Sequence, residues 1–149
     1  PKAATPIPEE FEVPFGKARV RRVGNDLSII TFGNTTHMCI EAADRLSKEH
    51  NIEVEVIDIR SIIPLDKDAI IQSVKRTGKA LVVHEDKVFA GFGGEIASII
   101  AEEAFEYLDG PVRRVGATFT PVGFNRILET VILPNTEKIL VAALDLAKY

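Results

Sequence analysis

The sequence predicts a single α/β domain with three layers, α/β/α, in which helices cover both faces of a mostly parallel sheet. Strand-like and helix-like segments alternate along the chain, an order typical of parallel strands joined by right-handed helical crossovers. The 149 residues suffice for one domain, and the fractions of hydrophobic residues (46%) and charged residues (27%) are ordinary for a globular protein. Residues 17–23 carry alternating charges and are separated from the next strand by only a short turn. We therefore expect them to form an antiparallel edge strand in a mixed five-stranded sheet.

The first sixteen residues are expected to form an extended linker, and residues 17–149 the α/β domain. Proline removes backbone donors and disfavours helix, and the linker contains Pro1, Pro6, Pro8 and Pro14. The chain also begins with proline and not with methionine. We therefore expect it to be a piece of a longer protein.

In the first half of the domain, Lys17–Val23 alternates charged and apolar residues, which predicts a strand with one solvent-facing side. Residues 27–32 are apolar and β-branched and predict a buried strand. A helix is expected to begin after Gly33 and to end near His50. Its apolar residues recur at helical spacing and are Cys39, Ala42, Ala43 and Leu46. Residues 53–58 predict the next strand.

The middle of the domain continues the alternation. Asp66 can cap the free N–H groups of a helix that Gly78 ends. Residues 79–84 predict a strand, and a helix follows Gly91–Gly94. This glycine run lacks the last glycine of a dinucleotide-binding loop, so we expect it to connect the two elements and to let the helix start close to its neighbour.

The last part predicts one strand and two helices. Residues 112–115 form a short strand after a turn, and a short helical segment lies around residues 126–132. The final helix has an apolar face formed by Ile139, Ala142, Ala143 and Leu146. These elements complete the expected five strands.

Composition excludes several functional classes. The net charge of −4 argues against general affinity for nucleic acid or for an anionic membrane. No apolar run approaches the roughly 20 residues needed to cross a bilayer. The single cysteine, Cys39, rules out an internal disulfide and a cysteine-based zinc site, and three histidines far apart in the sequence form no metal signature.

Ligands of open α/β sheets bind beyond the carboxyl ends of the strands, which singles out two groups of residues. Gly33, Thr35 and Thr36 could hold an anion at a helix N-terminus, although an ordinary turn with a threonine N-cap accounts for the same residues. His84 could act as a general base beside Glu85. Neighbouring strand residues point to opposite faces, however, and a hydrogen-bonded histidine beneath a loop is the alternative. We therefore expect no firm catalytic residue and no metal site.

A series of motifs also resembles one known family and keeps the family's order over nearly the whole chain. The motifs are Val13–Ala18, Glu55–Asp66, Ser73–Gly78, Val83–Glu85, Gly91–Ile96 and Leu108–Val115. They resemble the transketolase-type C-terminal domain of the beta subunit, or beta part, of thiamine-diphosphate-dependent 2-oxo acid dehydrogenases. The resemblance implies a mixed five-stranded sheet with one antiparallel strand. It also implies the reaction of the parent enzyme, which decarboxylates a branched-chain 2-oxo acid or pyruvate oxidatively and transfers the acyl group to a lipoyl arm.

The same resemblance implies that thiamine diphosphate and magnesium are bound elsewhere. The family's Gly-Asp-Gly motif, followed by Asn, is absent from this chain, and the cofactor-activating glutamate belongs to the preceding domain. We therefore expect no cofactor ligand here. The isolated domain is expected to be inactive and to serve assembly.

The partners implied are the N-terminal domains of the same parent chain, an alpha subunit or alpha part, a second beta copy and the lipoyl acyltransferase core. Tyr149 with its carboxylate is the candidate for docking that core. Phe119 stands where relatives often carry an acidic residue, which puts a role for its loop in doubt. The implied compartment is the bacterial cytoplasm or the mitochondrial matrix.

Two alternatives remain open. The chain could be a free-standing α/β module that binds a small ligand through the strand-end residues named above. It could also be the equivalent domain of transketolase or deoxyxylulose-phosphate synthase, enzymes without lipoyl transfer. The Val13–Ala18 segment speaks against the second alternative.

Overall fold

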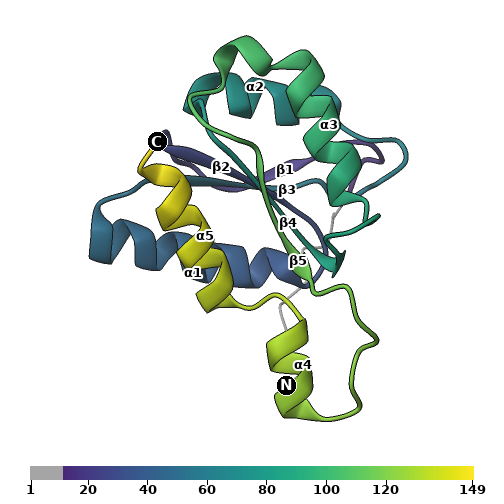
Figure 1. Ribbon diagram of the computed structural model, residues 1–149. Coiled ribbons are helices and arrows are strands. Elements are labelled where there is room, and N and C mark those ends of the chain that lie inside the picture. Colours follow the sequence, from purple (N-terminus) through teal and green to yellow (C-terminus); the bar gives the residue numbers. More distant parts are fainter. Residues whose placement is uncertain (1–11) are drawn as a thin grey trace.

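The computed structural model describes residues 12–149, which form a five-stranded sheet with helices on both faces (Figure 1). The predicted three-layer α/β fold is confirmed. Residues 1–11 of the expected linker lie outside the described part, so the linker boundary stays a prediction. The elements are β1 (Arg19–Arg22), β2 (Leu27–Thr31), α1 (Thr35–His50), β3 (Val54–Asp58), α2 (Lys67–Thr77), β4 (Ala80–Lys87), α3 (Gly93–Glu103), the 3-10 helix η1 (Phe105–Tyr107), β5 (Arg113–Ala117), α4 (Arg126–Ile132) and α5 (Thr136–Ala147).

The strand order is β1-β3-β2-β4-β5, and β1 is the antiparallel edge strand that the sequence predicts. Its neighbour is β3, with Val20 opposite Ile57, and not β2, the strand that follows it along the chain. The connection between β1 and β2 passes over the beginning of β3, where the backbone N–H of Asp26 donates to the carbonyl of Glu53 at 2.9 Å. Gly24 lies so close to the backbone there that a Cβ would collide with it. Strands two positions apart lie about 10 Å from each other, a distance that a turn of about four residues spans.

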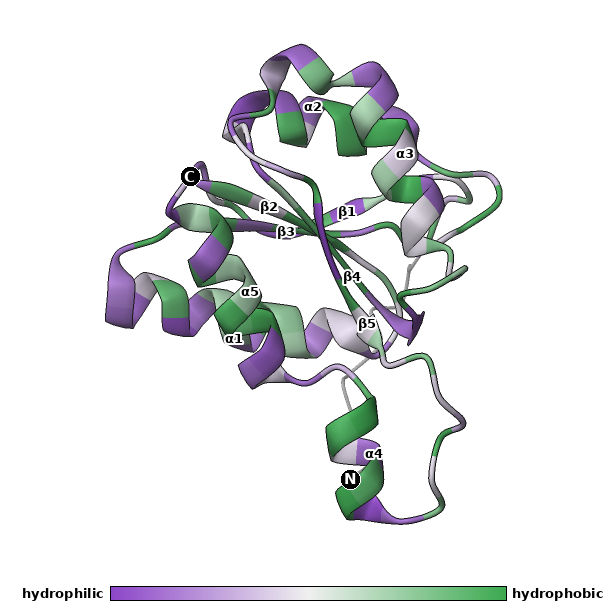
Figure 2. Ribbon diagram, in the orientation of Figure 1, coloured by the Kyte–Doolittle hydropathy of each residue, from purple (hydrophilic) through white to green (hydrophobic). Residues whose placement is uncertain are grey.

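Two apolar cores lie on the two faces of the sheet. Helices α1 and α5 cover one face, and α2 and α3 cover the other (Figure 1). Leu27 and Ile29 of β2 face the first core, whereas Ile30 faces the second. Figure 2 shows the apolar residues concentrated in the central strands and on the inner sides of these helices. All five residues of β2 are buried, as expected of a central parallel strand.

A buried polar network joins the sheet to α2. The hydroxyl oxygens of Ser28 and Ser73 are 2.6 Å apart, and the Ser73 hydroxyl donates to Glu55 at 2.5 Å. Arg76 forms an ion pair with the same Glu55 carboxylate, which is almost fully buried. The network therefore supplies hydrogen bonds to a charge that would otherwise be costly to bury.

Helix α4 stands apart from the layers, at the end of an excursion formed by residues 118–132 (Figure 1). The backbone N–H of Thr118 donates to the carbonyl of Ile132 at 3.0 Å and closes the base of this excursion. The short helical segment predicted around residues 126–132 is confirmed. None of its residues is buried.

Candidate functional site

The crevice at which an open α/β sheet would bind a ligand lies between the carboxyl ends of β2 and β4, because the strand order reverses there. Three aromatic rings meet at this point. The rings of Phe32 and His84 stack with centroids 6.4 Å apart and an interplanar angle of 7°. Phe92, at the start of α3, meets Phe32 edge-on at 6.0 Å. Packed aromatic rings therefore fill this position.

His84 is completely buried at this crevice. A Cβ placed on Gly91 or Gly93 would come within 3.0 Å of its imidazole, and one on Gly116 would lie 3.2 Å from Cε1. Within the described part of the chain, neither ring nitrogen has a hydrogen-bond partner. The histidine thus lies beneath a loop, as the alternative reading expects, but the expected hydrogen bond is not among its described contacts.

Burial also determines the charge of this ring. Desolvation lowers the pKa of His84, and the positive charge of Arg114 lowers it further, whereas Asp86 acts in the opposite direction. The imidazole is therefore neutral near pH 7. Glu85, the next residue, has an exposed side chain. The two candidate groups lie in different environments, so this placement does not support a shared proton-transfer role.

The second candidate group lies at the N-terminus of α1. The Thr35 hydroxyl donates to the carbonyl of Phe32 at 2.8 Å, and the N–H of Thr36 donates to the carbonyl of Gly33 at 3.2 Å. Asn34 occupies the N-cap position without a side-chain cap bond, and Thr35 and Thr36 are the first two residues of the helix. The expected threonine cap is therefore wrong. Anion binding at this turn stays a prediction.

The chain's C-terminal end borders two hollows. Tyr149 lines the first, of about 350 Å³, together with Arg113, Asp145 and Lys148. Gly110 packs against Tyr149 and also lines the second hollow, of about 680 Å³.

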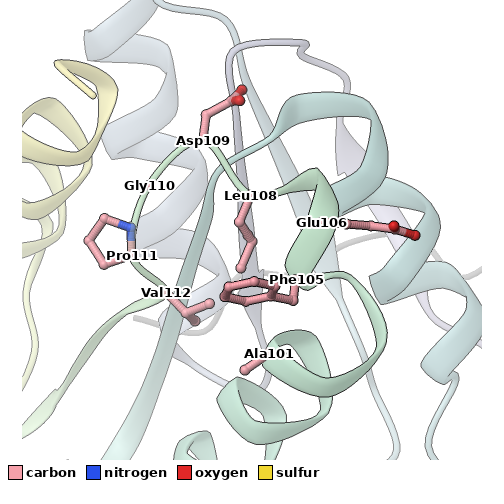
Figure 3. A pocket seen from close by; sticks show the side chains of 8 residues that line it. All are labelled: Ala101, Phe105, Glu106, Leu108, Asp109, Gly110, Pro111 and Val112. Carbon is pink, nitrogen blue, oxygen red and sulfur yellow. The ribbon is translucent and has the colours of Figure 1, made fainter.

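The second hollow has an apolar wall. Figure 3 shows Phe105, Leu108 and Val112 pointing toward one another, whereas the carboxylates of Glu106 and Asp109 point away from them. Its acidic rim and apolar wall suit a protein contact better than a small polar ligand.

Another surface escaped the sequence reasoning. Large apolar side chains lie exposed on the excursion between β5 and α5, including Phe124 and Ile127. The many apolar residues between positions 119 and 132 could have drawn attention to this segment. The sequence pattern alone, however, does not show that the sheet leaves these side chains uncovered.

The described residues offer no group of three or more His, Cys, Asp or Glu side chains that could hold a metal ion. A helix with the length and apolarity to span a bilayer is likewise not found among residues 12–149.

Known proteins resemble the chain over nearly all of its length. It is 41% identical over 144 residues to "Pyruvate dehydrogenase E1 component subunit beta" of Rickettsia felis, covering 96% of this chain and 44% of the relative. It is 36% identical over 142 residues to "2-oxoisovalerate dehydrogenase subunit beta" of Bacillus subtilis, covering 95% of this chain and 43% of the relative. The chain therefore spans less than half the length of these curated relatives.

A solved structure and a family match agree with the fold. The structure described as "Split gene transketolase, inactive beta4 tetramer" superposes with a TM-score of 0.76 at 25% identity, over 95% of this chain and 45% of that one. The family described as "Transketolase, C-terminal domain" matches residues 16–139. Because this match covers most of the sequence, the chain belongs to the transketolase C-terminal domain family.

Proposed function

We propose that this chain is an assembly domain of the decarboxylating component of a 2-oxo acid dehydrogenase. The parent enzyme decarboxylates a 2-oxo acid oxidatively and transfers the acyl group to a lipoyl arm. The observation that carries this proposal is the similarity over 95% or more of the chain to beta subunits of pyruvate and 2-oxoisovalerate dehydrogenases. The domain contributes surfaces to the parent enzyme and is inactive alone.

The packing at the carboxyl ends of β2 and β4 supports an assembly role and argues against a free-standing ligand-binding module. Phe32, His84 and Phe92 fill the position where such a module would hold its ligand. The His84 nitrogens are enclosed and do not face solvent. A ligand at this place would have to displace packed aromatic rings.

Thiamine diphosphate and magnesium belong to other domains of the parent in this proposal. A magnesium–diphosphate site needs carboxylate or carbonyl oxygens that converge on the cation. Among the described residues, no three or more His, Cys, Asp or Glu side chains form a group that could hold a metal ion. We derive no catalytic step through the cofactor from this chain.

The proposed partners are the N-terminal domains of the parent chain, an alpha subunit or alpha part, and a second beta copy. The lipoyl acyltransferase core is a further partner, at the end marked by Tyr149. The exposed tyrosine, its neighbours Arg113 and Lys148, and the adjacent apolar hollow offer both charge and apolar area to a protein partner. The compartment proposed is the bacterial cytoplasm or the mitochondrial matrix.

The substrate is proposed only as a 2-oxo acid. The motifs at residues 62–65 and 84–85 resemble those of branched-chain 2-oxo acid enzymes more than those of pyruvate enzymes, which favours a branched-chain substrate. The identity to the pyruvate enzyme of Rickettsia felis, 41%, is higher than that to the 2-oxoisovalerate enzyme of Bacillus subtilis, 36%. Substrate pockets of the parent lie in other domains.

Two measurements test the assembly role. Calorimetry of the chain with thiamine diphosphate and Mg²⁺ is expected to show no binding, and micromolar affinity would contradict the proposal. Light scattering of the chain mixed with the remaining part of a beta subunit and its alpha subunit is expected to show a complex. If no complex forms at micromolar concentrations, the domain is not an assembly unit of that enzyme.

A deletion and a control substitution test whether the C-terminal end of the chain binds the acyltransferase core. Deletion of Tyr149 is expected to weaken binding to the acyltransferase core by roughly tenfold, as loss of an aromatic interface residue commonly does. Val141→Lys, on the exposed side of α5, serves as the control and is expected to leave this binding unchanged. Equal effects of the two changes would remove Tyr149 from the docking surface.

A further inference from the structure

A hollow lies at the carboxyl ends of β4 and β5, one strand further along the sheet than the crevice that the aromatic rings fill. It has a volume of about 450 Å³ and is lined by Lys87, Phe119, Thr120 and Pro121. Lys87 is the last residue of β4, and the other three follow β5, where the chain leaves the sheet toward α4 (Figure 1). Because parallel sheets bind ligands at these strand ends, the hollow is a second candidate position for a ligand.

A register shift in β4 forms one side of the hollow. Val83 of β4 lies opposite Val115 of β5, but the next pair is Lys87 opposite Ala117, so β4 contributes two more residues than β5 between these pairs. Beyond the shift, the backbone N–H of Val88 donates to the carbonyl of Ala117 at 3.0 Å and joins the strands again. The backbone that carries Lys87 is therefore held by strand pairing on both sides of the extra residues.

An aromatic pair borders the hollow on its apolar side. The ring of Phe119 meets the ring of Phe89 edge-on, with the centroids 4.8 Å apart, so each ring restricts the other. Both rings remain largely accessible, with exposed fractions of 69% for Phe119 and 66% for Phe89. An apolar group that enters the hollow would remove part of this ring surface from water, which is favourable.

The polar groups of the hollow are a cation and a hydroxyl. None of the ion pairs among residues 12–149 involves the ammonium group of Lys87. Its acidic neighbour Asp86 accepts a hydrogen bond from the backbone N–H of Lys87, at 2.7 Å. The backbone N–H of Thr120 donates to the carbonyl of Thr118 at 2.7 Å, so the Thr120 hydroxyl is the donor that this residue can offer a ligand. A positive charge and a hydroxyl donor thus lie beside an apolar wall.

This combination favours a single carboxylate with an apolar tail. Phosphate groups are typically held by helix N-termini or by arginine side chains, and neither lines the hollow. One lysine and one hydroxyl can contact the two oxygens of a carboxylate. A branched acid of six carbons needs roughly 200 Å³, since each non-hydrogen atom takes up slightly less than the ~30 Å³ of a water molecule in the liquid. The hollow has room for an acid of this size.

We propose that the hollow between the ends of β4 and β5 binds a small monocarboxylate with an apolar tail. The carboxylate faces the ammonium group of Lys87 and accepts a hydrogen bond from the hydroxyl of Thr120, and the tail lies against the ring of Phe119. This ligand site goes beyond the proposed assembly function and does not depend on it. The hollow is open on one side, so we expect a dissociation constant on the order of 1 mM.

A titration of the ¹⁵N-labelled 149-residue chain with 4-methylpentanoate, followed by nuclear magnetic resonance, tests the site. We expect saturable shifts of the backbone amides of residues 87–89 and 118–120, with half-saturation on the order of 1 mM. Two further probes separate charge from tail. The uncharged 4-methylpentanamide should bind roughly fivefold more weakly, and inorganic phosphate should not shift these amides to saturation. Shifts that stay linear up to 50 mM, or that saturate at other residues, overturn the proposal, as does equal binding of the acid and its amide.

Three variants assign the binding to the named side chains. Lys87→Gln should weaken binding of 4-methylpentanoate by roughly fivefold. Phe119→Asp removes the apolar wall and places a carboxylate near Lys87, so saturable binding should be lost. Lys48→Gln removes the same charge from an exposed position of α1 and is the control, with binding unchanged. Circular dichroism checks that all three variants keep the fold. Binding by Lys87→Gln as tight as that of the parent chain, or equal weakening by Lys48→Gln, overturns the proposal.

Discussion

Gly93 and Gly94 are adjacent at the start of α3, yet only one of them has room for a methyl group. A Cβ on Gly93 would lie well under 3.0 Å from Cδ2 and Nε2 of the buried His84. A Cβ on Gly94 would have as its nearest neighbour Nη1 of Arg114, an exposed and flexible side chain, at 3.2 Å. We therefore expect Gly93→Ala and Gly94→Ala to change stability in opposite directions.

The difference between the two variants isolates the packing of His84. Replacing glycine by alanine in a helix stabilises it by up to about 1 kcal/mol, and this gain is similar at the two positions. In Gly93→Ala the imidazole must also retreat by roughly 1.5 Å to reach an ordinary carbon–carbon separation. Phe32 and Gly116 occupy the other sides of the ring, so the strain is that of an overpacked core, about 1–3 kcal/mol. Gly93→Ala should therefore be less stable than Gly94→Ala by about 1–3 kcal/mol.

Urea unfolding followed by circular dichroism measures this difference. We expect the midpoint of Gly94→Ala to equal or exceed that of the parent chain, and the midpoint of Gly93→Ala to fall below it. A double-mutant cycle with His84→Ala completes the test, because removal of the ring provides space for the new methyl group. In the His84→Ala background, Gly93→Ala should then leave the midpoint unchanged or raise it, as Gly94→Ala does in the parent chain.

Equal midpoints for the two glycine variants would refute the reasoning. The same holds if Gly93→Ala is as destabilising without the imidazole as with it. Either result would mean that the glycines do not enclose His84 as the structure shows.

Three further changes test other parts of the structure. Burial lowers the pKa of His84 below the value of about 6.5 that it has in the unfolded chain. The free energy of unfolding should therefore be undiminished above about pH 6.5. Below that pH it should decrease by up to about 1.4 kcal/mol per pH unit until the folded-state pKa is reached. Urea titrations at pH 7.5 and 5.5 should show this loss in the parent chain and a smaller one in His84→Ala. Arg76→Ala leaves the buried Glu55 carboxylate without its ion-pair partner, so the free energy of unfolding from urea titration should decrease by about 1–3 kcal/mol. Arg113→Ala, at an exposed position, is the control and should cause a smaller decrease. Lys138→Met removes the hydrogen bonds to the carbonyls at the end of α4. Amide hydrogen exchange in α4 should therefore accelerate by roughly tenfold, while exchange in β2 stays unchanged. Equal protection of α4 in both proteins would show that the lysine does not hold the helix.

Local patterns predicted most elements, and the reason is visible in particular segments. The runs at 27–32 and 79–84 are mostly apolar and are bounded by turn residues, because their strands are central and largely buried on both faces. The alternating charges of Lys17–Val23 identify an edge strand, since an edge leaves one side to solvent. The neighbour of that strand was not predictable, because the connection over β3 depends on which strands meet in space.

The candidate site shows the same division. The position of His84 at the end of a strand follows from the sequence, as does a helix that starts close to its neighbour after Gly91–Gly94. The identity of that neighbour does not. Gly116 belongs to β5, more than thirty residues from His84, and only strand pairing brings it to the imidazole.

The sequence by itself determined the fold class, the edge strand and, through a series of motifs in order, the family. These features are local or are repeated along the chain, so each segment carries its own signal. The tertiary structure decided which apolar side chains are covered. Residues 27–30 and residues 127–131 are both rich in large aliphatic residues, yet the former lie inside the sheet and the latter lie outside it. Burial depends on which surfaces the folded chain brings together, and α4 remains exposed because the sheet faces are already occupied by α1, α2, α3 and α5.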